Sequence, residues 1–142
     1  MAVFIVTTEI DDELDTLFET DPDEASAADL LLSLLYENGT ILDDLRPPQT
    51  VYQYSPTFEF KIFEEAQKQG LNVYILKYQD PEHGHLCKHR ILVGYHPQRD
   101  RFYALTIIPR DADYATDSAE FLRLANRYEL YGIPPIPGAR VR

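Results

Sequence analysis

The chain has 142 residues, of which 44% are hydrophobic and 12% aromatic, a composition that excludes a largely disordered protein and predicts one domain with a substantial core. The formal net charge of −11 is unevenly distributed: residues 1–45 hold 13 acidic residues and no Lys or Arg, whereas residues 46–142 hold 11 acidic and 13 basic residues. A solvated acidic helical surface is the simpler interpretation. The alternative is a bipolar molecule whose sheet is positive enough to bind a phosphate ligand.

Two features of the sequence bear on cellular location. The single cysteine, Cys87, excludes an intramolecular disulfide and fits a reducing compartment. The apolar run at residues 3–6 has no basic residue before it and is too short for a signal peptide or a membrane span. We therefore expect a soluble, cytoplasmic protein without membrane association.

Short patterns near the N-terminus predict a strand followed by a helix. Residues 2–8 contain a continuous apolar run that is typical of a buried strand. Residues 10–20 carry apolar side chains at helical spacing with acidic side chains between them, which predicts an amphipathic helix.

A second helix is predicted over residues 22–38. Asp21 can cap it, Pro22 suits its first position, and Glu24 completes a capping-box pattern three residues after the cap. Gly39 is expected to end this helix in a left-handed conformation.

The centre of the chain predicts a series of strands. Residues 41–56 are interpreted as a connection, and residues 58–63 alternate apolar and polar side chains with the period of a strand. Residues 64–69 fit either an extension of that strand or one helical turn, which Gly70 ends. Runs rich in β-branched and aromatic residues then predict three strands, at residues 72–78, 89–95 and 101–108.

The last part of the chain predicts a helix and a tail. Asp117 and Glu120 form a capping-box pattern before apolar residues at helical spacing, Gly132 is expected to cap the helix, and the proline-rich residues 133–142 are expected to be extended. The complete order predicts an α+β fold in a single domain of residues 1–132. We expect an antiparallel sheet of four to five strands, an N-terminal helical hairpin and a C-terminal helix.

Possible metal ligands gather before the second of these central strands, at His83, His85, Cys87 and His89. A His-x-His pair in an extended segment can chelate one ion, because alternate side chains share a face. All four residues span about 20 Å at the rise of a strand, so a straight strand cannot bring them to one ion. We therefore predict a polar turn with no metal and no cofactor, and a small buried Cys87 rather than a nucleophile, which would need a lowered pKa and an oriented base.

Basic residues form the other candidate site, because they recur on or just after the three central strands: Lys77, Lys88, Arg90, Arg101 and Arg110. Arginine presents a planar fork suited to phosphate, and the nearby Tyr114 can stack on an unpaired base. The alternative is that these are ordinary surface charges at strand ends. If the chain has a chemical site, we place it here.

Four segments resemble motifs of the RelE/HigB-like superfamily of toxin–antitoxin modules, phage-derived variants included. They lie at residues 34–39, 73–77, 89–93 and 102–110. The order of elements is also similar, because in that family a helical hairpin is followed by an antiparallel sheet. The resemblance covers residues 29–127. Ile75 stands where the family has a second strand lysine, so one cation is missing from the pattern.

The resemblance implies an endoribonuclease that cleaves mRNA, often on the ribosome, without a metal. The 2′-hydroxyl attacks the adjacent phosphate and the 5′-oxygen leaves, which requires a base, an acid and cations. Carried over by position, Lys77 is the expected base or charge stabiliser, and Arg90 the phosphate ligand. Arg110 is expected to stabilise or protonate the leaving oxygen, and Tyr114 to stack on a base. A lysine base needs a lowered pKa, which clustered cations can supply.

The implied partners are mRNA or the ribosome, together with a cognate antitoxin. A second hypothesis is a catalytically inactive RelE-like protein whose acidic residues 1–45 bind an antitoxin or another basic protein, since complementary charge accelerates association. A third is a metal-dependent enzyme that uses His83, His85 and His89.

Overall fold

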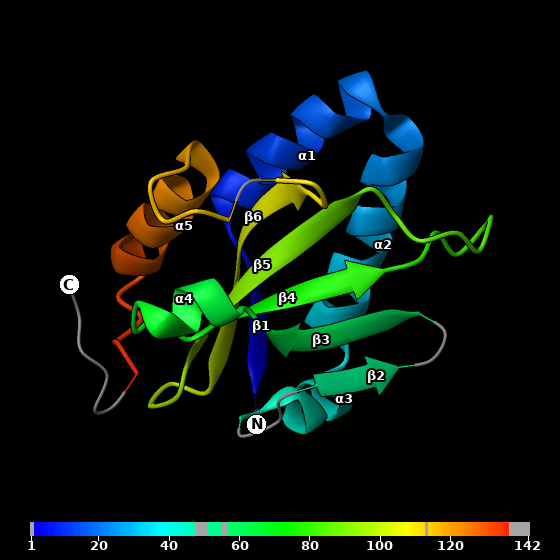
Figure 1. The fold of residues 1–142 in the computed structure, drawn as a ribbon. Helices are drawn as coiled ribbons and strands as arrows, with labels where there is room; N and C mark the ends of the chain where they lie inside the picture. Colours follow the sequence, from blue (N-terminus) through cyan, green and yellow to red (C-terminus); the bar gives the residue numbers. More distant parts are fainter. Residues whose placement is uncertain (1, 48–50, 55–56, 113, 137–142) are drawn as a thin grey trace.

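The structure is a computed structural model and describes residues 2–47, 51–54, 57–112 and 114–136 (Figure 1). The strands are β1 (Val3–Val6), β2 (Val51–Tyr54), β3 (Phe58–Ile62), β4 (Val73–Tyr78), β5 (His89–His96) and β6 (Arg101–Pro109). The helices are α1 (Thr8–Thr20), α2 (Pro22–Glu37), α3 (Gly39–Leu45), α4 (Glu64–Lys68) and α5 (Ala119–Leu130). The predicted α+β class is confirmed. No helix in the described ranges combines the length and apolar character needed to span a bilayer.

The sheet differs from the prediction in size and direction. Its six strands are ordered β1-β6-β5-β4-β3-β2, and β1 pairs with β6 in parallel, whereas the other neighbours are antiparallel. The sheet is therefore larger than the expected four to five strands, and one of its pairings is parallel where all were expected to be antiparallel. The segment 41–56, interpreted as a connection, contributes α3 and the edge strand β2. The direction of β1 depends on a partner near the far end of the chain, which no local pattern reveals.

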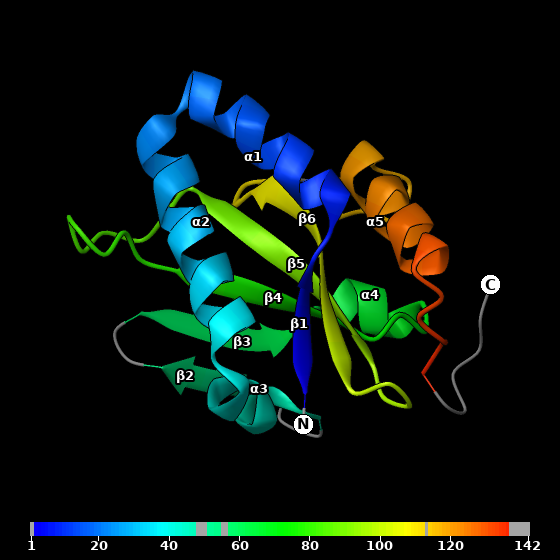
Figure 2. The ribbon, with the colours of Figure 1, turned by 180° about the vertical axis from the view of Figure 1, so that it is seen from behind.

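The helices form two unequal layers on the sheet. Figures 1 and 2 show α1, α2 and α3 on one face, and α4 with α5 on the other. Alternate side chains of the strands divide accordingly: Phe60 and Phe102 pack with the first layer, whereas Leu92 and Leu105 pack with the second. Two cores thus lie back to back on one sheet.

The boundaries of α1 and α2 follow capping chemistry, with two departures from expectation. The Asp21 side chain accepts from the Glu24 N–H at 3.4 Å, as predicted, but the Glu24 carboxylate points to β5 instead of completing a capping box. Gly39 is not a left-handed cap. It begins α3, whose first turn is capped by Asn38 through the Ile41 N–H at 3.3 Å. The chain restarts a helix there because Asn38 is itself a good cap.

The C-terminal region ends as a packed segment. Ser118, one residue after the expected Asp117, caps α5, and Gly132 adopts the predicted left-handed conformation at φ 69°. Ile133 is buried over Gly94, where a Cβ atom would lie only 2.7 Å from the Ile133 Cδ1 atom. The Ile136 N–H donates to the Gly70 carbonyl at 2.8 Å. The first part of the predicted tail therefore packs on the domain, while residues 137–142 lie outside the described residues.

One edge of β6 is completed by side chains instead of a strand. β1 ends with Val6 opposite Ala104, and the register shift between β5 and β6 leaves Leu105 without a Cα partner. The Thr7 hydroxyl donates to the Ala104 carbonyl at 2.7 Å, and Arg127 Nη1 donates to the Leu105 carbonyl at 2.8 Å.

Glu13 completes this arrangement. Its Oε1 atom accepts from the Ile107 N–H at 3.2 Å and from Arg127 Nη1 at 2.7 Å. Because an unpaired buried peptide group is costly, these contacts fix α1 and α5 against β6.

Replacing Glu13 by Ala should therefore lower the free energy of unfolding by about 2 kcal/mol, because the Ile107 N–H and Arg127 both lose their acceptor. Urea denaturation followed by circular dichroism measures this change. Asp12→Ala, at the adjacent exposed position, should stay within about 0.5 kcal/mol of the unchanged protein. Equal effects of the two variants would contradict the role given to Glu13.

Candidate functional site

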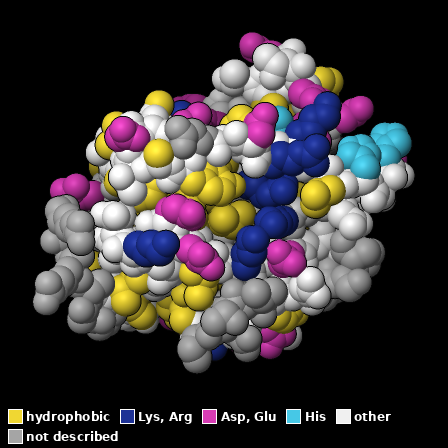
Figure 3. Space-filling view, viewed as in Figure 1, with side chains coloured by type: hydrophobic (Ala, Val, Ile, Leu, Met, Phe, Trp, Pro, Cys, Tyr) yellow, Lys and Arg dark blue, Asp and Glu magenta, His cyan; other side chains and the backbone are white. Residues whose placement is uncertain are grey.

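Three basic side chains share the face of the sheet that carries α4 and α5, because each stands two residues from an apolar side chain of the core on that face and alternate strand residues point the same way. The pairs are Lys61 with Phe63, Lys77 with Ile75, and Arg90 with Leu92. A fourth basic residue, Arg110, follows in the turn after β6. Figure 3 shows Lys and Arg side chains as a continuous band across this face, beside the area that the two helices cover. We call these four residues the basic band.

Lys77 is the most perturbed member of the basic band. The pKa of its ammonium group is lowered, first through side-chain contact with Lys61, then through partial burial, and then through the charges of Lys61 and Arg90. Glu59, which is the Cα partner of Lys77 on β3, acts in the opposite direction. The two lysines on neighbouring strands thus make Lys77 easier to deprotonate than an ordinary lysine.

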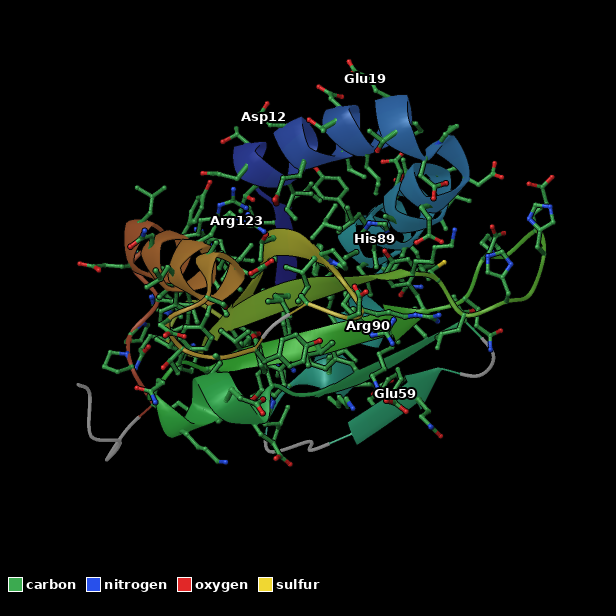
Figure 4. The ribbon with its side chains drawn as sticks, turned by 45° about the horizontal axis from the view of Figure 1, so that its top comes forward. Asp12, Glu19, Glu59, His89, Arg90 and Arg123 are labelled. Carbon is green, nitrogen blue, oxygen red and sulfur yellow. The ribbon has the colours of Figure 1, made fainter. Side chains whose placement is uncertain are left out.

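Arg90 is nearly buried, with 7% of its surface exposed. Its Nη1 atom donates to the Cys87 carbonyl at 3.2 Å and, less favourably, to the His89 carbonyl at 3.4 Å. These bonds hold one side of the guanidinium against the start of β5. Figure 4 shows Arg90 and Glu59 on neighbouring parts of the sheet surface. A guanidinium has five N–H donors, so the two carbonyls use only part of its capacity.

Tyr114 lies beside the band, but its ring is not free on both sides. The ring is half-buried and packs against Phe63, with centroids 4.9 Å apart and planes tilted by 58°. Burial raises the pKa of the Tyr114 hydroxyl, whereas the charges of Arg90 and Lys61 lower it, so the hydroxyl lies near both cations. Stacking of a nucleobase on this ring is limited to the part that Phe63 leaves accessible.

Arg110 occupies the end of the band, just after β6. Its backbone N–H donates to the Lys88 carbonyl at 2.7 Å, and its side chain is exposed. Asp111, which follows it, is exposed too, while Asp113 lies outside the described residues. Among carboxylates of the described ranges, none forms an ion pair with any of the four band cations.

Two hollows lie on the surface. One, of about 390 Å³, adjoins the band, and its lining includes both Lys77 and Glu59. The other, of about 380 Å³, lies between α1 and β6, and its lining includes Glu9, Asp12 and Arg127. The first hollow thus combines one cation with one carboxylate, whereas carboxylates predominate in the second.

Lys61 was not predicted as a site residue. The family resemblance places a second lysine at the position that Ile75 occupies in this chain. In the structure Lys61 is the Cα partner of Ile75, so the neighbouring strand supplies a cation at that place. The alternating pattern of residues 58–63 already indicated that Lys61 points away from Phe60. The pairing of β3 with β4 was the missing information, because α4 interrupts the chain between these two strands.

The His83–His89 segment is not a straight strand. Cys87 is fully buried, and burial, followed by the charges of Glu24 and Asp80, raises the pKa of its thiol to about 12. The prediction of a small buried cysteine is therefore confirmed, and the thiol is a poor nucleophile. His89 belongs to a different contact, because its Nδ1 atom lies 2.8 Å from the buried carboxylate of Glu24.

No family model, no curated protein and no solved structure matches the chain.

Replacing Lys61 by Met should raise the pKa of Lys77 towards the ordinary value for lysine, because a neighbouring positive charge and a contact are both lost. NMR titration of lysine labelled at its side-chain nitrogen measures the pKa directly. Lys68→Met, on the exposed surface of α4, is the matched control and should leave the pKa of Lys77 unchanged. An unaltered pKa in the Lys61 variant would show that another feature lowers it.

Proposed function

We propose that this protein is a RelE-like endoribonuclease that cleaves mRNA at the basic band without a metal. The single observation that supports this most strongly is the place of Lys61, Lys77 and Arg90 on one face of adjacent strands, where their charges lower the pKa of Lys77. It supplies what a lysine base needs, a pKa below the ordinary value, and it places further cations where a phosphate would bind.

The arrangement of elements supports the same family. A strand and the helical hairpin α1–α2 precede three consecutive antiparallel strands, β4 to β6, and α5 follows them. This order agrees with the helical hairpin and antiparallel sheet that the sequence resemblance implies. Because one fold can carry many functions, the proposal of endonuclease activity rests on the residues of the basic band and not on the fold.

The proposed chemistry assigns one role to each group. The neutral Lys77 amine accepts the proton of the 2′-hydroxyl as its oxygen attacks the adjacent phosphorus. Lys61 and Arg90 balance the negative charge that grows on the phosphate oxygens. The bond from phosphorus to the 5′-oxygen then breaks, and Arg110 stabilises or protonates that oxygen. The products are a 2′,3′-cyclic phosphate and a free 5′-hydroxyl.

The surroundings of the band suit a single RNA strand. The hollow beside Lys77 has the volume of a small-ligand site and offers the side-chain amide of Gln79 to a nucleobase, while the Gln53 amide donates to Glu59 at 2.9 Å. The partly exposed ring of Tyr114 borders the cations on the other side. The acidic side chains of α1 lie over the opposite face of the sheet, where they do not meet the RNA backbone (Figure 4).

Controlled expression in bacterial cells tests this proposal. The unchanged protein should arrest growth and generate transcripts with new 5′-hydroxyl ends, and Lys77→Met should reduce cleavage by about 100-fold or more because the base is lost. Lys68→Met should cleave as efficiently as the unchanged protein. Normal growth and full-length transcripts at high expression would remove the hypothesis.

A purified assay then separates the chemical steps. A labelled oligoribonucleotide, with and without ribosomes, should give a cyclic phosphate in the presence of a chelator, and a single deoxyribose at the cleaved position should block the reaction. The rate should rise with pH as Lys77 loses its proton, and Lys61→Met should move this rise to higher pH because the pKa of Lys77 increases. Cleavage of the deoxyribose substrate would exclude attack by the 2′-hydroxyl.

A second candidate function is binding of a basic protein without catalysis. It is favoured by the exposed carboxylates along α1, among them Asp12 and Glu19. Figure 4 shows these two side chains directed away from the sheet. Such a surface accelerates association with a basic partner, such as an antitoxin.

A low-salt pull-down from cell extract tests this second function and should recover a basic protein. The double variant Asp12→Lys with Asp15→Lys should associate with that protein at least about tenfold more slowly than the unchanged chain. Replacements of Lys77 should leave this capture intact. Recovery of no basic protein at low salt would argue against the binding function.

A further inference from the structure

The connection between β4 and β5 projects from the body of the protein, as Figures 1 and 2 show. It folds back on itself at Asp80. The Asp80 N–H donates to the His85 carbonyl at 2.8 Å, and the Gly84 N–H donates to the Asp80 carbonyl at 2.7 Å. Gly84 adopts φ 73°, which glycine tolerates without strain, so the chain reverses between His83 and His85.

The turn brings three metal-ligating side chains together. Asp80, His83 and His85 each offer a ligand atom, and these atoms all lie within 4.8 Å of one another. The two imidazole rings face each other, with centroids 6.0 Å apart and planes inclined by 30°. In a straight strand the histidines would be too far apart to share one ion, but this segment forms a turn and brings His83 and His85 together.

Asp80 is held in place for such a role. Asp80 is 5% exposed, and its Oδ1 atom accepts from the Glu82 N–H at 2.8 Å and from the His83 N–H at 3.1 Å. The other oxygen, Oδ2, lies 3.3 Å from His83 Nδ1. One carboxylate oxygen therefore anchors the group, and the second faces the histidine.

The histidines have the freedom that the carboxylate lacks. The side chain of His83 is 54% exposed, and His85 is exposed as well. Ligand atoms around a tetrahedral zinc ion lie about 3.3 Å apart, given metal–ligand bonds of about 2.0 Å. The ligand atoms of the site now lie within 4.8 Å of one another, and the exposed imidazole rings have room to rotate towards the shorter spacing.

We propose that Asp80, His83 and His85 form a surface site for one divalent transition-metal ion, with zinc as the reference ion. Two imidazoles and one carboxylate match the ligands that zinc, cobalt and nickel prefer, whereas magnesium and calcium prefer oxygen ligands alone. Three protein ligands leave at least one position for water. The site does not rest on the nuclease proposal, and its residues do not belong to the basic band.

Isothermal titration of the untagged full chain with zinc chloride tests the site, and it should give one equivalent bound. His83→Ala and His85→Ala should each weaken binding by about 100-fold, since loss of a direct ligand exceeds the effects of outer contacts. Asp80→Asn keeps an oxygen for the backbone donors and should weaken binding at least tenfold. Glu82→Gln is the matched control for the carboxylate and should bind as the unchanged protein does.

NMR spectra provide a second measurement, because they identify which histidines bind the ion. The ring nitrogens of His83 and His85 should shift in NMR spectra on addition of zinc, whereas those of His89, held by Glu24, and of His96 should not. His89→Gln should keep the affinity of the unchanged protein. The proposal is overturned if zinc fails to bind at one equivalent, if His85→Ala binds equally well, or if His89 is the histidine whose signals shift.

Discussion

The incomplete edge of β6 is the constraint on which the arrangement of the whole protein depends. β1 covers only the first part of that edge, and the following peptide groups need hydrogen-bond partners because they are buried. Thr7, Glu13 and Arg127 supply them from the start of α1, from within α1 and from α5. The need to satisfy one strand edge thus positions a helix on each face of the sheet. It also explains why the acidic helix α1 turns Glu13 inward while Asp11 and Asp12 face solvent.

With both helices fixed there, the two faces of the sheet are covered unequally. The layer of α1, α2 and α3 packs on one face, whereas α4 and α5 cover only part of the other. The uncovered part lies over β3, β4 and β5, where alternate residues are Lys61, Lys77 and Arg90. The acidic N-terminal residues and the cations therefore lie on opposite sides of one sheet. Other cations do meet the acidic N-terminal residues, since Arg127 pairs with Glu13 and Lys88 with Asp21.

The two proposed sites differ in how they are built. Three residues of the basic band stand on paired strands, so the strand register sets the positions of their backbones, which suits a reaction that needs charge in place before the substrate arrives. The Asp80 turn projects from the sheet, and only its carboxylate is immobilised, so an ion would have to organise the two exposed histidines. The turn is joined to the band through the end of β4, which carries Lys77, and through the start of β5, where Glu24 fixes His89 and the Cys87 carbonyl fixes Arg90. That junction keeps the histidine of the strand away from the histidines of the turn.

Local pattern in the sequence determined the α+β class, the three central strands, both long N-terminal helices and the burial of Cys87, because periodicity and capping act over a few residues. It also indicated Lys77, Arg90, Arg110 and Tyr114 as candidates, whose roles remain predictions. Only the tertiary structure decided the parallel pairing of β1 with β6, the added edge strand β2, the place of Lys61 beside Lys77, and the separation of His89 from His83 and His85. Each of these depends on contacts between residues distant in the chain or on a turn whose closure only coordinates reveal. Strand order and long-range register leave no trace in the spacing of neighbouring residues.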